Sequence, residues 1–156
     1  MQTSPQRLLV VEDDVTIARA VSRMLARQGF AVAIGRSCAA ARALALAQHF
    51  DYAVLDLDLP DGNGVDLARD LLAADRVPNV VFFTGSSDPS LVARARRLGN
   101  VVMKSSGTSE ILALLTQENL DAPESRTAPS HSMQRIRAHS GVTTTSSVAT
   151  PKSRAR

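Results

Sequence analysis

The sequence predicts an α/β fold in which five parallel strands form one doubly wound sheet with helices on both faces. Two observations support this prediction. Apolar segments of three to five residues alternate five times with longer segments in which apolar residues recur at helical spacing. The short segments are apolar almost throughout, as is typical of parallel strands that are buried on both faces. Each connecting helix must then run back across the sheet to reach the next strand.

The expected elements follow this alternation along the chain. The five expected strands are 8–11, 30–34, 52–55, 80–83 and 101–103. The helices that follow them are marked, in order, by Ile17 to Leu25, by 37–48, by Val65 to Leu72, by Leu91 to Leu98 and by Ile111 to Leu115. Gly29 and Gly35 fall where the first helix and the second strand should end, and Ser37 is a suitable N-cap for the second helix.

The composition of the 156 residues excludes several other classes of protein. Apolar residues make up 44% and charged residues 21%, a balance typical of a globular domain. Apolar runs such as 80–83 are far shorter than the ~20 residues that span a bilayer, so we expect no membrane insertion. The N-terminal segment lacks the features of a secretory signal, which predicts a cytoplasmic protein. A single cysteine, Cys38, excludes an internal disulfide and a structural zinc site.

The C-terminal part of the chain differs in composition from the rest. The chain carries a formal charge of +3, of which residues 121–156 contribute +4 and residues 1–120 contribute −1. Residues 121–156 are rich in Ser, Thr, Ala, Pro and Arg, with too few large apolar side chains to offset the entropy lost on ordering. We therefore expect a folded domain over 1–120 and a disordered basic tail over 121–156. This tail is either a solvated extension or a weak contact for anions or nucleic acid.

Polar residues follow four of the five strands at the edge of the sheet where ligands usually bind. The first strand is followed by Glu12, Asp13 and Asp14, the third by Asp56, Asp58 and Asp61, the fourth by Thr84 and the fifth by Lys104. Crowded carboxylates raise one another's pKa unless a cation is bound, and Mg²⁺ prefers oxygen ligands. A nucleophilic carboxylate, a metal, a hydroxyl and an ammonium together supply what phosphoryl transfer requires. Asp14 is better explained as the N-cap of the following helix.

The order and spacing of these residues resemble the receiver domain of bacterial two-component response regulators. The resemblance rests on Val10-Val11-Glu12-Asp13-Asp14, on Val54 to Gly64, on Phe83-Thr84-Gly85 and on Met103-Lys104. It covers about residues 7–118 and implies a flavodoxin-like fold of five strand and helix units. It also implies a place in a phosphorelay, in which a sensor histidine kinase or a histidine phosphotransfer protein is the phosphoryl donor.

The resemblance assigns a role to each residue at the edge of the sheet. Asp56 would accept the phosphoryl group from a phosphohistidine. Asp13 and Asp56 would hold Mg²⁺ through their side chains, Glu12 would assist largely through water, and the backbone carbonyl of Asp58 would supply a further ligand.

The remaining site residues would respond to the new phosphoryl group. Thr84 would donate a hydrogen bond to a phosphoryl oxygen, and Lys104 would pair with the same group as a cation. Gly85 is a small residue beside the phosphoryl site, where a side chain would block approach. The added charge would bias the loop after the fourth strand and the face formed by the fourth helix, the fifth strand and the fifth helix.

Three positions differ from the usual pattern of the family. Lys104 is followed by Ser105 in place of proline, and because a cis bond before serine costs about 2.5–4 kcal/mol we expect a trans peptide. Val101 occupies the place of an aromatic residue that commonly moves together with the threonine. Asp58 adds a negative side chain near the acceptor, where we expect it to affect phosphoryl lifetime or metal affinity.

The 36 residues after the predicted domain lack the helical periodicity of a helix-turn-helix. We therefore expect no direct DNA binding by this chain and an output through contacts with an unknown downstream protein. The chain would be a signalling phosphoacceptor with only its own phosphorylation and dephosphorylation as chemistry, and not an enzyme with an external substrate.

Two alternatives stay open at the level of sequence. Asp56-Leu57-Asp58 also resembles the opening motif of haloacid-dehalogenase-type phosphatases, in which the first aspartate is the nucleophile and the second a general acid. Those enzymes place this motif near the N-terminus, whereas two strand and helix units precede Asp56 here. The other alternative is a receiver that does not switch and serves as a constitutive interaction module.

Overall fold

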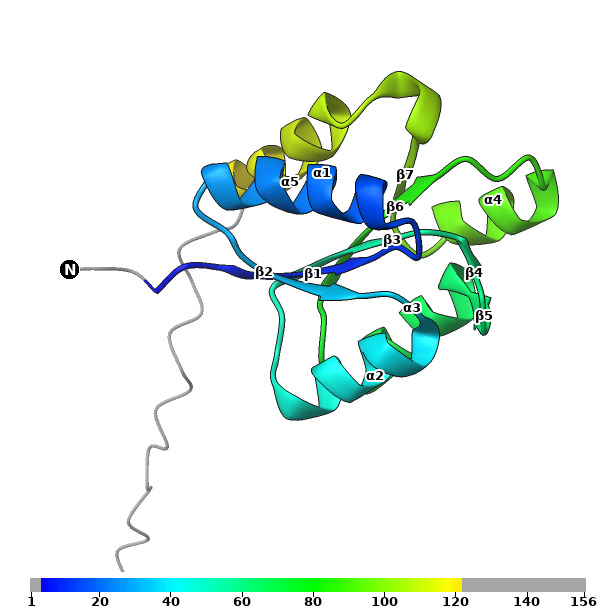
Figure 1. Cartoon of the computed structure of the whole chain (residues 1–156), viewed down its shortest axis with the longest axis horizontal. Helices are drawn as coiled ribbons and strands as arrows, with labels where there is room; N and C mark the ends of the chain where they lie inside the picture. Colours follow the sequence, from blue (N-terminus) through cyan, green and yellow to red (C-terminus); the bar gives the residue numbers. More distant parts are fainter. Residues whose placement is uncertain (1–3, 122–156) are drawn as a thin grey trace, which may run out of the picture. The chain divides into compact units, whose positions relative to one another are not determined.

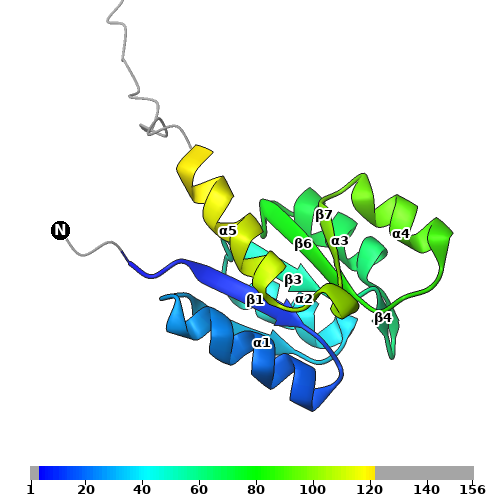
Figure 2. The same cartoon turned by 90° about the horizontal axis from the view of Figure 1, so that it is seen from above.

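The structure is a computed structural model that describes residues 4–121 of the chain. Five parallel strands form its main sheet, in the spatial order β2-β1-β3-β6-β7 (Figures 1 and 2). These strands are β1 (Arg7–Val11), β2 (Ala31–Gly35), β3 (Tyr52–Leu55), β6 (Asn79–Thr84) and β7 (Asn100–Met103). The order changes direction between β1 and β3, which is the place where doubly wound sheets open a crevice for ligands. The predicted fold class is confirmed.

Helices cover both faces of the sheet, as Figure 1 shows. On one face lie α1 (Val15–Arg27) and α5 (Ser109–Asp121), and on the other lie α2 (Cys38–Ala47), α3 (Gly64–Ala73) and α4 (Pro89–Arg96). A single 3₁₀ turn, η1 (Lys104–Ser106), links β7 to α5. None of the described helices is long and apolar enough to cross a membrane.

The sheet divides the apolar interior into two separate cores. Alternate residues of each strand point to opposite faces, so Leu9 and Val11 of β1 pack toward α2 and α3 while Leu8 and Val10 pack toward α1 and α5. All four of these side chains are almost completely buried. Since both faces are covered, the strands must be apolar throughout, and this is the pattern that predicts them.

The ends of the first two helices are fixed by local interactions that the sequence predicts. Asp14 is the N-cap of α1, because its Oδ1 accepts hydrogen bonds from the backbone N–H groups of Thr16 (2.8 Å) and Ile17 (3.0 Å). Ser37 caps α2 by accepting a hydrogen bond from the backbone N–H of Ala40. Gly29 follows α1 with a φ of 93°, a conformation that favours glycine.

The structure departs from the expected elements in several places, and α4, for example, ends at Arg96, before the expected Leu98. A short antiparallel hairpin, β4 (Asp58–Leu59) and β5 (Gly62–Asn63), separates β3 from α3. Apolar periodicity does not detect strands of two residues. The second strand begins one residue later than expected, at Ala31, because Phe30 turns into the core and packs edge to face against Tyr52 with ring centroids 6.0 Å apart. The predicted tail lies outside the described residues from 122 onward, and the division at residue 120 stays a prediction.

Candidate functional site

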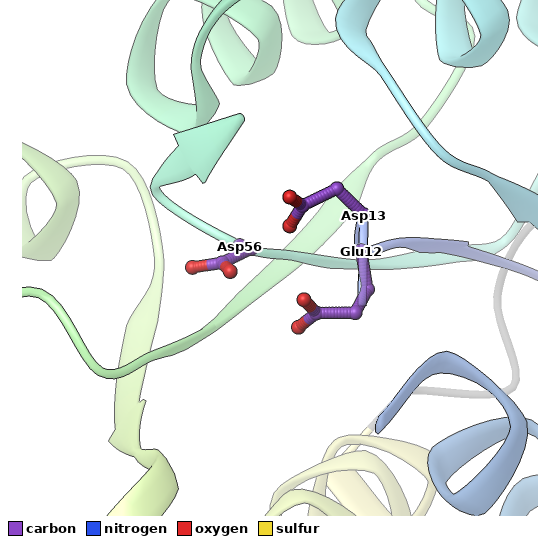
Figure 3. A group of neighbouring side chains, drawn as sticks. All are labelled: Glu12, Asp13 and Asp56. Carbon is purple, nitrogen blue, oxygen red and sulfur yellow. The ribbon is translucent and has the colours of Figure 1, made fainter. Parts of the chain in front are cut away.

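Three acidic residues meet where β1 and β3 end. The two strands are neighbours with Val11 opposite Leu55, so the residues that follow them, Glu12 and Asp56, leave the sheet side by side. The backbone N–H of Asp56 donates to Val11 O at 2.9 Å and holds this register. One carboxylate oxygen from each of Glu12, Asp13 and Asp56 lies within 4.8 Å of the others (Figure 3). Glu12 and Asp56 are buried, whereas Asp13 is exposed.

The carboxylate of Asp56 is held at both of its oxygens. Oδ1 accepts a hydrogen bond from the backbone N–H of Leu57 at 2.7 Å, and Oδ2 accepts one from Lys104 Nζ at 2.7 Å. The residue is only 5% exposed. A buried carboxylate is stable when it is paired and hydrogen-bonded, and both conditions are met here.

Gly64 packs closely against the backbone of Asp56. A Cβ at Gly64 would lie 2.1 Å from the carbonyl oxygen of Asp56, far inside contact distance. The backbone N–H of Gly64 also donates to Leu57 O at 2.9 Å. From the sequence alone we assign no role to Gly64. The signal that could have identified it is its place at the first position of α3, directly after the N-cap Asn63, where a glycine allows close backbone packing.

Lys104 connects two of the three acids. Its Nζ lies 2.7 Å from Glu12 Oε2 and 2.7 Å from Asp56 Oδ2. Burial acts to lower the pKa of Lys104, but the hydrogen bonds to Asp56 and Glu12 outweigh it and the pKa is raised. The pKa of Glu12 is raised mainly by burial and further by the charge of Asp56, against the opposing effect of Lys104. The ammonium thus offsets part of the negative charge that the three acids bring together.

The strand register explains why Lys104 reaches this position. Thr84 and Met103 are opposite each other in β6 and β7, so Lys104 follows β7 at the same edge of the sheet. Gly85, the next residue after β6, leaves room for the lysine stem, because the nearest heavy atom to a Cβ there would be Lys104 Cδ at 3.7 Å. The small residue therefore lies beside the lysine that contacts Asp56.

Thr84 is completely buried at the end of β6. Its Oγ1 accepts a hydrogen bond from the backbone N–H of Ser86 at 3.0 Å. Because that bond uses an oxygen lone pair, the hydroxyl proton of Thr84 is still available to an acceptor. The turn after β6 is thus folded onto the threonine side chain.

The three acids have the oxygen donors that a hard divalent cation prefers and lie close enough together to form a candidate site for one. Mg²⁺ binds oxygens at about 2.0–2.1 Å and keeps several waters, so carboxylates within a few ångströms of each other are suited to it. The backbone N–H of Asp58 lies 3.4 Å from Asp56 Oδ1, which places this peptide against the cluster. Glu12 is further oriented by the backbone N–H of Asp14, which donates to its Oε1 at 3.2 Å.

Asp61 does not join the cluster, contrary to our expectation from its place after the third strand. Its carboxylate caps α2 instead, accepting hydrogen bonds from the backbone N–H groups of Cys38 (2.7 Å) and Ala39 (2.9 Å). Both bonds lower the pKa of Asp61, and the bond from Ala39 has the larger effect. The cause is the β4–β5 hairpin, whose turn carries Asp61 away from Asp56 and over the start of α2.

Comparison with known proteins gives consistent matches over this part of the chain. The family model of the response regulator receiver domain matches residues 8–116. The acid tolerance regulatory protein ActR of Rhizobium meliloti (strain 1021) is 32% identical over 122 residues, covering 75% of this chain and 63% of ActR. The DNA-binding response regulator MtrA of Mycolicibacterium smegmatis is 34% identical over 115 residues, covering 72% of this chain and 50% of MtrA. The chain thus spans less than two thirds of the length of these two relatives.

The fold is also found among solved structures. The CheY-like response regulator receiver domain protein from Methanospirillum hungatei JF-1 matches with a TM-score of 0.67 and 23% identity, covering 74% of this chain and 94% of that one. At this level of identity the match supports the fold alone. The strand order and helix arrangement described above are therefore those of a known architecture.

Proposed function

This chain belongs to the response regulator receiver domain family, whose members are signalling phosphoacceptors, and from that premise we propose that Asp56 accepts the phosphoryl group. One observation carries the proposal: the carboxylate of Asp56 lies beside the two acids that follow β1 and also contacts the ammonium of Lys104. An oxygen of Asp56 attacks phosphorus, the bond from phosphorus to the donor's histidine nitrogen breaks, and an acyl phosphate forms. The donor is a sensor histidine kinase or a histidine phosphotransfer protein.

The proposal includes Mg²⁺ at the acidic cluster. The side chains of Asp13 and Asp56 would hold the ion, with Glu12 acting largely through water and the backbone carbonyl of Asp58 as a further ligand. When bound, the ion supplies positive charge that neutralises phosphoryl oxygens. Glu12 is already bound to Lys104, which fits an indirect part in metal binding.

Lys104 and Thr84 would respond to the phosphoryl group. In the described structure Lys104 neutralises Asp56 directly. Phosphorylation turns the attacking carboxylate oxygen into a bridge to phosphorus and adds negatively charged acceptor oxygens slightly farther out. Lys104 can follow this charge by moving its flexible stem, and Thr84 has a hydroxyl proton to donate. Such new contacts favour one of two conformations of the turn after β6.

We place the output of this signal in contacts with other proteins. Val101 lies in β7 in place of the aromatic residue common in the family, so the coupling between Thr84 and the α4, β7 and α5 surface must use other side chains. The proposal also includes an unknown downstream partner, a lack of DNA binding and a cytoplasmic location. It further includes the expectation that the chain has no external substrate.

The decisive experiment is labelling by a small phosphodonor in the presence of Mg²⁺. Intact-protein mass spectrometry should show one added phosphoryl group in the wild type and none in Asp56→Ala. Asp58→Asn is the matched control, because it removes a neighbouring carboxylate and should leave labelling in place. Equal labelling of Asp56→Ala would refute the assignment. Steady hydrolysis of phosphate esters that is lost in Asp58→Asn would favour the phosphatase alternative, which the family match does not favour.

A second measurement separates a switch from a constitutive module. Amide hydrogen exchange of the turn after β6 and of α4 should change when the phosphodonor and Mg²⁺ are added to the wild type. Asp56→Ala should show no such change. An identical exchange pattern in labelled and unlabelled protein would support the module that does not switch.

A further inference from the structure

The solvent side of α2 is unusually apolar. The helix has one charged residue, Arg42, among its ten residues, and its exposed positions include Ala39, Ala43, Leu46 and Ala47. A helix on the surface of a domain normally presents polar side chains to water. Leu46 is 74% exposed, the highest value among the large apolar residues in the part of the chain that the structure describes.

A hollow lies next to Leu46, between α2 and α3. These helices pack side by side on the face of the sheet opposite α1 and α5 (Figure 1). The hollow measures about 240 Å³, and its apolar lining comes from Ala45, Leu46, Leu71 and Ala74. A cavity of about 150 Å³ is large enough to hold a benzene ring, so the hollow has room for an isobutyl group.

Charges of both signs surround this apolar surface. Arg42 donates to Asp70 Oδ2 from Nε (3.1 Å) and from Nη2 (2.7 Å), so its charge is already matched. Arg76 Nη1 lies 3.1 Å from Nε2 of His49, which must accept because a guanidinium can only donate. Within residues 4–121 no carboxylate is found in contact with the Arg76 side chain, while the exposed Asp75 lies beside it in the sequence.

This mixture of charges determines which kind of binding partner fits the hollow. A strongly acidic partner would meet Asp70, and a strongly basic segment, such as residues 122–156 of this chain with six basic residues and one acidic residue, would meet two arginines. A second copy of the same surface presents Arg76 next to the exposed Asp75, and two copies can pair these residues reciprocally while each Arg42 stays paired with its own Asp70. Interfaces between identical subunits are commonly of this self-complementary kind.

We propose that the α2 and α3 surface binds a second copy of this chain about a two-fold axis. In this arrangement each Leu46 enters the hollow of the other copy, and Ala39, Ala43 and Ala47, which share one side of α2, allow the two helices to approach closely. The surface also leaves the acidic site open. Because α2 runs antiparallel to the strands, Leu46 lies toward the edge where the strands begin, whereas Asp56 follows the end of β3.

Sedimentation velocity of the full chain over a concentration series tests this interface. We expect the wild type to form dimers and Leu46→Glu to weaken the dimer at least about tenfold, because it places a charge in the centre of an apolar contact. The matched control is Val15→Glu, which makes the same change at an exposed apolar residue of α1 and should alter the dissociation constant less than about twofold. Leu46→Gln provides a second variant without a charge and should also weaken the dimer.

Three results would overturn the proposal. One is a wild type that stays monomeric at the highest concentration reached, and another is a dimer that Leu46→Glu and Leu46→Gln leave intact. The third is an equal loss of dimer in Val15→Glu. Circular dichroism and phosphodonor labelling of Leu46→Glu should match the wild type, which separates loss of the interface from loss of the fold and from failure of the proposed acceptor.

Discussion

The two halves of the acidic site are built in different ways. Glu12, Asp13 and Asp56 follow the paired strands β1 and β3, and the backbone of Asp56 is fixed by strand register and by contact with Gly64. Lys104 reaches the same place through a long flexible side chain that starts from a single 3₁₀ turn. Asp56 is therefore held by backbone packing that tolerates little change, whereas Lys104 can adjust its position. A site that must first accept a group and then respond to it needs both properties.

The largest effect should come from a methyl group added at Gly64, next to the backbone of Asp56. Gly64→Ala places a Cβ 2.1 Å from Asp56 O, and we expect it to lower the free energy of unfolding by about 3 kcal/mol. The control is Gly85→Ala in the cationic half, where the nearest atom is Lys104 Cδ at 3.7 Å and a loss below about 0.5 kcal/mol is expected. Urea denaturation measures both, and equal losses would contradict the contrast between the two halves.

Removal of the lysine should have the next largest effect. Lys104→Met leaves the buried carboxylates of Glu12 and Asp56 without their ammonium partner, and we expect a loss of about 2 kcal/mol without Mg²⁺ because the lysine is partly exposed. Mg²⁺ should restore more stability in this variant than in the wild type, since ion and ammonium neutralise the same carboxylates. Thermal unfolding with and without Mg²⁺ measures this difference. The same Mg²⁺ response in both proteins would argue against a shared site.

The N-caps of α1 and α4 allow a similar comparison with a smaller expected loss of stability. Asp14 caps α1 beside the acids, and Asp88 caps α4 by accepting hydrogen bonds from Ser90 N and Leu91 N. Changing either to alanine should lower stability by about 1 kcal/mol. Only Asp14→Ala should also weaken Mg²⁺ binding, because loss of the cap frees the backbone of residue 14, whose N–H orients Glu12. Isothermal titration with Mg²⁺ distinguishes them, and a similar loss of affinity in Asp88→Ala would contradict the prediction.

The smallest effect concerns Asp61, which lies outside both halves. Hydrogen bonds from Ala39 and Cys38 hold the pKa of this carboxyl below its usual range, so it stabilises the fold above the unfolded-state pKa. That contribution disappears as the pH falls through the lower, folded-state pKa. Asp61→Asn should therefore lose less melting temperature than the wild type on acidification from neutral pH. Parallel melting curves for the two proteins at every pH would show that the cap does not titrate as described.

The positions of the strands and of the acids could be predicted because they depend on short-range patterns. A parallel strand buried on both faces must be apolar, so runs such as 52–55 mark the strand and the residue that follows it. Once parallel pairing is assumed, Glu12 and Asp56 are brought together by topology alone. The roles assigned to them come from the family resemblance, and they remain predictions for this chain.

Other features depend on contacts that no local pattern encodes. The direction of Asp61 is set by a hairpin of two-residue strands, which is too short to give a periodic signal. The contact of Lys104 with both Glu12 and Asp56 depends on how far a flexible stem extends across neighbouring strands. Leu46 has the same apolar character as Leu44, which is partly buried against the core, and the packed helix shows that Leu46 faces outward.

The division of the interior by the sheet has a consequence for how this protein can evolve. The side chains under α1 and α5 belong to one core and those under α2, α3 and α4 to another, with the strand backbones as their common boundary. Substitutions that reshape one side can therefore accumulate with little need for compensating changes on the other. One helical face can therefore be remodelled in evolution while the opposite face and the acidic site keep their form.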